Sequence, residues 1–169
     1  MNDASLWPAA LFAGLALFLG FLPAVLTFAL RPNAVSAIGL DQVPIPGWFF
    51  TGVWVVIYPC MGIAAWTVWA RSPVDPALAT LALLVLAATL LQTTSFWLTN
   101  SLRSTAVIDA TGVLLALLSL AAALLAAGGA AAIWLAPLVV WMPTTLTIKI
   151  IAIRERTSPS TGTRRGQKA

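Results

Sequence analysis

The sequence predicts an all-α integral membrane protein, a bundle of five transmembrane helices. Of its 169 residues, 60% are hydrophobic and only 8% are charged, whereas a soluble domain carries about 25% charged residues. Because so few charged groups could not cover a soluble surface, the bilayer must be the solvent. Five apolar runs are separated by short polar breaks, and each is long enough to cross the hydrocarbon core, which takes about 20 residues.

The polar breaks define the five expected spans and two regions of the chain. The spans are residues 7–30, 48–70, 77–98, 105–127 and 130–153. The longest break is loop 31–47, where three prolines and two glycines indicate an ordered loop with room for one helical turn. A glycine pair, Gly128-Gly129, ends the fourth span. We therefore expect one transmembrane domain, residues 1–153, and a basic disordered tail, residues 154–169.

The basic residues predict the orientation of the bundle. The net charge of +4 comes mostly from the tail, so it indicates topology and not nucleic-acid binding. Five spans place the two ends of the chain on opposite sides. One side carries seven basic residues: Arg31, Arg103, Arg154, Arg156, Arg164, Arg165 and Lys168. The other side carries only Arg71, so we expect the C-terminus in the cytoplasm and the N-terminus outside.

The chain has no histidine. It therefore lacks the usual imidazole ligand for zinc or haem and the usual general base at neutral pH. We expect no metal site and no catalytic residue.

Residues 46–69 carry the most informative pattern. Trp54, Tyr58, Met61 and Ala65 follow at spacings of four, three and four, which places them on one helical face. The indole and phenol groups lie near mid-span and need hydrogen-bond partners there. This face should therefore look into the bundle.

This segment resembles the TspO/MBR family, the tryptophan-rich sensory proteins related to the mitochondrial translocator protein. The matching residues are Pro46-Gly47-Trp48, Phe50, Val53-Trp54, Tyr58, Met61-Gly62, Ala64-Ala65-Trp66 and Val68-Trp69. A second match lies in the last span, where Pro137 and Trp141 keep the family spacing. The chain departs from the family in loop 31–47, which lacks the lysine, the first proline, the first tryptophan and one of two adjacent prolines; Leu40, Asp41, Val43 and Ile45 stand in their places. It departs again at Phe96, where the family has asparagine.

The resemblance implies a ligand-binding protein of the bacterial inner membrane that forms a homodimer, in which the partner is a second copy of the chain. It implies an aromatic-lined intramembrane pocket for porphyrins and other tetrapyrroles, or for sterol-like molecules, with no covalently bound cofactor. The candidate ligand-binding residues are Trp54, Tyr58, Gln92, Phe96, Trp97 and Trp141. For each aromatic residue the alternative is packing against lipid or another helix. A haem-like porphyrin would be a ligand of this pocket.

Three polar residues inside the spans have two interpretations each. Gln92 should face the bundle and either join two helices or contact a ligand. Asp109 either interacts with the amides at the start of its helix or pairs with Arg103 or with a basic group of the second or fifth span. Lys149, where the family pattern has asparagine, either extends to the cytoplasmic interface or lines the pocket and attracts an acidic ligand.

Three functions therefore compete. The first is a receptor, sensor or carrier for flat apolar ligands, and the retained segment 46–69 and Trp141 favour it. The second is a porphyrin-degrading photo-oxidative enzyme, and the third is a ligand-free structural or regulatory partner of a membrane complex. A dimer could use the small residues of the third span or the pairs Ala122/Ala126 and Ala123/Ala127.

Overall fold

The computed structural model describes residues 6–31, 33–38, 43–71 and 74–157, and all regular structure in these ranges is helical. The long helices are α1 (Leu6–Leu30), α3 (Gly47–Arg71), α4 (Pro76–Ser95), α5 (Leu102–Ala127) and α7 (Ala136–Thr157). The short ones are α2 (Ala34–Ile38), η3 (Phe96–Leu98), α6 (Gly129–Ala132) and η4 (Ile133–Leu135). Five stretches are long and apolar enough to cross a membrane, the last running through α6, η4 and α7. The predicted fold class is therefore confirmed.

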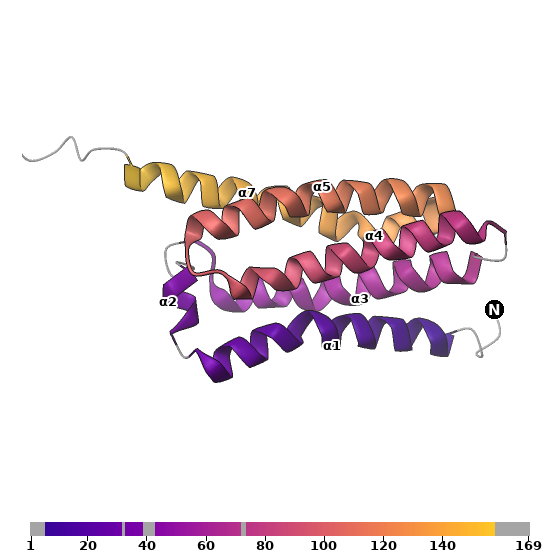
Figure 1. Ribbon diagram of the computed structural model, residues 1–169, viewed down its shortest axis with the longest axis horizontal. Coiled ribbons are helices and arrows are strands. Elements are labelled where there is room, and N and C mark those ends of the chain that lie inside the picture. The colour runs from indigo at the N-terminus through magenta and orange to yellow at the C-terminus, as the bar shows by residue number, and fades with distance from the viewer. Residues whose placement is uncertain (1–5, 32, 39–42, 72–73, 158–169) are drawn as a thin grey trace, which may run out of the picture.

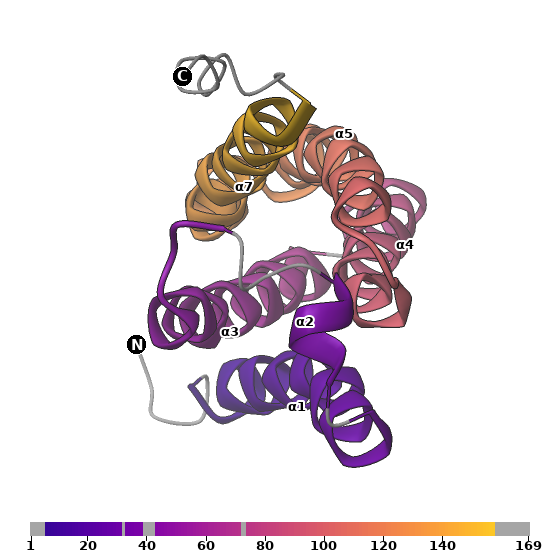
Figure 2. The same ribbon diagram turned by 90° about the vertical axis from the view of Figure 1, so that its left-hand side faces the viewer.

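The five long helices run side by side (Figure 1). Viewed from one end, they follow one another in the order α1, α3, α7, α5 and α4 (Figure 2). Helix α3 packs against all four of the others, so its side chains hold the bundle together. The helical turn expected in the first loop is confirmed as α2, which lies across this end of the bundle (Figure 2).

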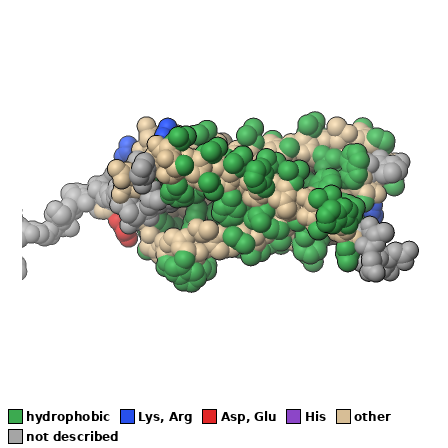
Figure 3. Space-filling model, turned by 90° about the horizontal axis from the view of Figure 1, so that it is seen from below, with side chains coloured by type: hydrophobic (Ala, Val, Ile, Leu, Met, Phe, Trp, Pro, Cys, Tyr) green, Lys and Arg blue, Asp and Glu red, His purple; other side chains and the backbone are tan. Residues whose placement is uncertain are grey.

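The outer surface has the composition that lipid requires. Figure 3 shows apolar side chains over the middle of one face and charged side chains near its two ends. Large apolar residues are exposed on several helices, among them Phe18, Leu91 and Val140. Since such a surface would be unstable in water and is stable in hydrocarbon, the chain is a multi-pass membrane protein.

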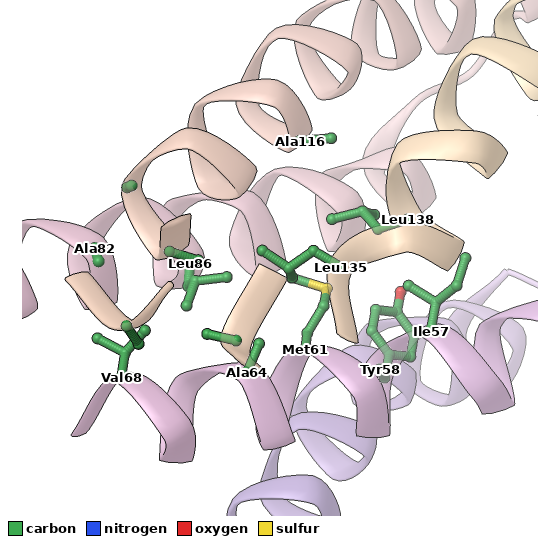
Figure 4. Packing of buried hydrophobic residues seen from close by; sticks show 14 of the residues in the cluster. Ile57, Tyr58, Met61, Ala64, Val68, Ala82, Leu86, Ala116, Leu135 and Leu138 are labelled. Atoms are coloured by element: carbon green, nitrogen blue, oxygen red, sulfur yellow. The ribbon is translucent and has the colours of Figure 1, made fainter. Parts of the chain in front are cut away.

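The predicted inner face of α3 is confirmed. Tyr58 and Met61 are buried, and Trp54 and Ala65 are half-buried. Figure 4 shows the buried side chains of this helix directed toward Leu135 and Leu138 of η4 and α7. The ring residues near mid-span therefore point between the helices, away from the acyl chains.

A glycine lets α1 and α3 approach closely. A Cβ atom on Gly62 would lie 2.6 Å from the Phe12 carbonyl carbon and 2.7 Å from the Cα atom of Ala13. These are backbone atoms, which cannot turn away as a flexible side chain would. The contact is of the small-residue kind that lets membrane helices pack at short range.

The break predicted at Gly128 is also confirmed, because α5 ends there with a φ angle of 67°. This region is unfavourable for a residue with a Cβ atom. Of the alanine residues that a dimer could use, Ala122, Ala123 and Ala127 are buried within the chain, and Ala126 is half-buried. They pack against neighbouring helices of the same molecule, so they offer little surface to a dimer seam.

Candidate functional site

A small cavity lies between the long helices, in the half of the bundle nearer α2. Its volume is about 30 Å³, enough for about two water molecules. Five of the six candidate ligand-binding residues line it: Trp54, Tyr58, Gln92, Phe96 and Trp97. Asp109 and Lys149 line it as well. Residues chosen from separate spans thus meet at one place.

Aromatic rings form one wall of the cavity. The rings of Trp54 and Tyr58 are stacked, with centroids 4.9 Å apart and planes inclined by 29°. Phe21 of α1 meets the edge of Tyr58 at 5.4 Å, and Phe50 meets Trp54 and Phe96 at about 6 Å. Flat ring faces that stack on each other can also stack on a flat ligand.

Trp141 occupies a different position from the other candidates. It is buried, but it is absent from the cavity wall. Its ring packs at about 6 Å against Phe49 and Phe50, and its indole N–H has no hydrogen-bond partner within the described part of the chain. Trp141 therefore supports the aromatic wall from behind in this structure.

A buried ion pair forms the polar part of the cavity. The Lys149 Nζ atom lies 2.6 Å from the Asp109 Oδ2 atom, and both side chains are nearly fully buried. The ammonium group also lies over the Phe96 ring, 4.4 Å from its centroid, a favourable cation–π arrangement. The pair joins α5 to α7 in the interior of the bundle, at the cavity.

This ion pair corrects two expectations and confirms a third. The interpretation in which Lys149 extends to the cytoplasmic interface was wrong, because a carboxylate within reach compensates its charge inside the bundle. The interpretation in which Asp109 interacts with the first amides of its helix was also wrong, because α5 begins seven residues earlier at Leu102. The alternative, pairing of Asp109 with a basic group of the fifth span, is confirmed.

Gln92 joins two helices, as one of its interpretations required. Its amide nitrogen donates to the Ile108 carbonyl oxygen and, at 3.5 Å, to the Thr111 hydroxyl. Because the Ile108 carbonyl group can only accept a hydrogen bond, the Gln92 side-chain atom that faces it must be the amide nitrogen. The Gln92 Oε1 atom has no hydrogen-bond partner among the residues that the structure describes. A Cβ atom on Gly112 would lie 2.9 Å from it, so the glycine makes room for this amide.

Helix α2 covers the end of the site. Ala34 and Ile38 are buried against Phe96. The face of the same Phe96 ring contacts the Lys149 ammonium group. Phe50 and Trp97 pack against the same cluster. The first loop thus contacts the cavity wall directly, although its residues 39–42, which include two of its departures from the family, lie outside the described residues.

Sequence reasoning missed several residues of the cavity wall. They include Gly20, Phe21, Phe50, Thr93, Met142 and Thr145. Phe50 could have been found, because it precedes Trp54 by four residues and so shares its helical face. The residues from α1 carry no such signal, since only the packing of α1 against Tyr58 brings them to the site.

With this geometry established, comparison with known proteins identifies the family. Residues 12–153 match the TspO/MBR family. The chain belongs to this family. No curated protein and no solved structure matches it. The TspO/MBR match includes all the polar and aromatic residues placed around the cavity above, so the site lies within the part of the chain that matches the family.

Proposed function

We propose that this TspO/MBR protein is a membrane receptor, sensor or carrier that binds a porphyrin or another flat apolar ligand between its helices. One observation carries the proposal: ring side chains of α1, α3 and η3 converge on a cavity that also contains a charged pair. Ligand sites typically combine an apolar, aromatic lining with a few polar groups that orient the ligand. The membership in the family supports the same role.

The proposed ligand requires a more open form of the protein. The cavity of about 30 Å³ is roughly ten times smaller than the sites of about 300 Å³ or more that hold drug-sized molecules. The side chains best placed to move are Phe96 and Trp97, because they belong to the short helix η3 and lie under α2. Ligand entry would therefore displace α2 together with these rings.

We also propose that α2 lies on the cytoplasmic side of a bacterial inner membrane. Among the described residues, Arg31, Arg103 and Arg154 belong to the helix ends near α2, and Arg71 belongs to the opposite end (Figure 1). Positively charged residues favour the cytoplasmic side. A cysteine introduced at Arg103, on a chain whose Cys60 is replaced by alanine, should be blocked by a membrane-impermeant thiol reagent only in inverted vesicles. Labelling in intact cells would contradict this orientation.

Titration of the purified protein with protoporphyrin in detergent, kept in the dark and followed by porphyrin absorption, tests the binding proposal. Wild type should show saturable binding with about one porphyrin per chain. Trp54→Ala removes a ring that lines the cavity and should weaken binding about tenfold or more, since a stacked ring contributes roughly 1–3 kcal/mol. Trp69→Ala is the matched control, because Trp69 lies on the same helix, is exposed and is absent from the cavity wall.

A result with no saturable binding in wild type would overturn the proposal. Equal losses in the Trp54→Ala and Trp69→Ala variants would also overturn it, because the macrocycle would then be binding to tryptophans on the outer surface.

The small size of the cavity favours a second candidate, a ligand-free structural partner of a membrane complex. In that case the rings serve only to pack the helices. Purification in a mild detergent would then yield the protein bound stoichiometrically to another membrane protein, and the porphyrin titration would show no saturation. Isolation of a monodisperse chain without a partner would contradict this candidate.

A further inference from the structure

We infer that the ligand of this cavity carries a carboxylate, which binds Lys149 in place of Asp109. The inference rests on the proposed function and specifies the chemical class of its ligand: a flat apolar body with an acidic side chain. Lys149, Asp109 and the stacked rings of Trp54 and Tyr58 line the same cavity. A ligand whose flat face lies against these rings can therefore direct an acidic group to the ammonium group.

Lys149 has capacity for another acceptor. An ammonium group donates three hydrogen bonds. In the structure one carboxylate oxygen of Asp109 and the face of the Phe96 ring are its partners. The remaining N–H group can donate to an acceptor inside the cavity, because the hydrocarbon around the bundle supplies none. An ionised acceptor such as a carboxylate forms a hydrogen bond with an ammonium group that is roughly twice as strong as a bond between neutral groups.

Asp109 competes with such a ligand. The Lys149–Asp109 pair is electrically neutral, so a second carboxylate beside it would bring one uncompensated negative charge into the bundle. An uncompensated buried charge is strongly unfavourable. Removal of the charge of Asp109 should therefore tighten the binding of an acidic ligand, even though it removes a contact that is present in the ligand-free protein.

The test compares protoporphyrin, which has two carboxyl groups, with its dimethyl ester, which has the same ring system and no acid. The measured quantity is the ratio of the affinity for the acid to the affinity for the ester. Asp109→Asn should raise this ratio about tenfold or more, because the acid then forms a charge-assisted hydrogen bond with Lys149 and no competing carboxylate remains. Lys149→Met should lower the ratio by a similar factor.

Two further variants control for folding and for charge. The double variant Asp109→Asn/Lys149→Met contains no unpaired charge, so it should fold even where a single variant does not. It should show the low ratio of Lys149→Met. Lys149→Arg keeps a positive charge and should hold the ratio near the wild-type value. A role of the pair in folding alone would change both affinities together and leave the ratio constant.

The outcomes separate this inference from the proposed function. If acid and ester both bind and their ratio is the same in all five proteins, the carboxylate inference is overturned and the binding proposal stands. If neither porphyrin binds to wild type, both are overturned. A ratio that rises in Asp109→Asn and falls in the double variant supports the inference.

Discussion

Substitution of Gly20 by alanine should disturb the aromatic wall from the side of α1. A Cβ atom on Gly20 would lie 2.5 Å from two carbons of the Tyr58 ring and 2.6 Å from a third. Carbon atoms in contact prefer about 3.5–4.0 Å, so the ring must move by roughly 1 Å. The ring is held between Phe21 and Trp54, and its displacement should therefore distort the cavity.

We expect Gly20→Ala to destabilise the protein by about 1–3 kcal/mol, the usual cost of overpacking a well-packed core. Gly14→Ala, on the same helix, is the matched control, because a Cβ atom at Gly14 has no neighbour within 4 Å. Both variants gain similar helix propensity, about 1 kcal/mol by soluble-helix scales, so the difference between them isolates the contact with Tyr58. The free energy of unfolding is measured by titration with a denaturing detergent, followed by tryptophan fluorescence.

The same two variants are then titrated with porphyrin. Gly20→Ala should bind it more weakly, and Gly14→Ala should bind like wild type. Equal unfolding free energies for the two variants would show that Gly20 does not lie against the Tyr58 ring, and would place Tyr58 away from α1.

Three other predictions concern the ion pair, the break after α5 and the cover of the cavity. Lys149→Met and Asp109→Asn should each destabilise the protein by about 3–5 kcal/mol, because each leaves the other charge buried without a partner. The double variant should recover at least half of the loss. Additive losses of unfolding free energy in a denaturing-detergent titration would show that the pair is not formed. Gly128→Ala should cost about 1–3 kcal/mol in the same assay because of its positive φ angle, while Gly129→Ala should be near neutral, and equal values would contradict the turn. Ile38→Ala should increase the rate of porphyrin association in stopped-flow mixing, because Ile38 packs on Phe96 over the cavity; an unchanged rate would mean that α2 does not limit entry.

The fold could be predicted from the sequence because the bilayer imposes strong constraints. Apolar runs of about 20 residues must be helices in hydrocarbon, and polar breaks such as Gly128-Gly129 separate them. The inner face of α3 was predictable for the same reason, since spacing fixes which side chains share a face. The residues facing it across the bundle were not, because spacing within one helix carries no information about the rotation of the next.

The candidate site shows the same limit. The charges of Asp109 and Lys149 marked them as unusual for hydrocarbon, but they are 40 residues apart and only the packing of α5 on α7 brings them to 2.6 Å. The aromatic character of Trp141 made it look like the other ring residues, yet it packs behind Phe50. The state of the cavity, nearly filled by its own rings, depends on side-chain packing that no motif describes.

An experimental structure of the protein with bound porphyrin would test the central claim most directly. The claim is that the rings of α3 receive a flat ligand inside the bundle. We expect a macrocycle in contact with Trp54 and Tyr58, with α2 and Phe96 displaced from their ligand-free positions and a carboxylate near Lys149. A macrocycle on the lipid-facing side of α3, with the interior still filled by its own side chains, would contradict it.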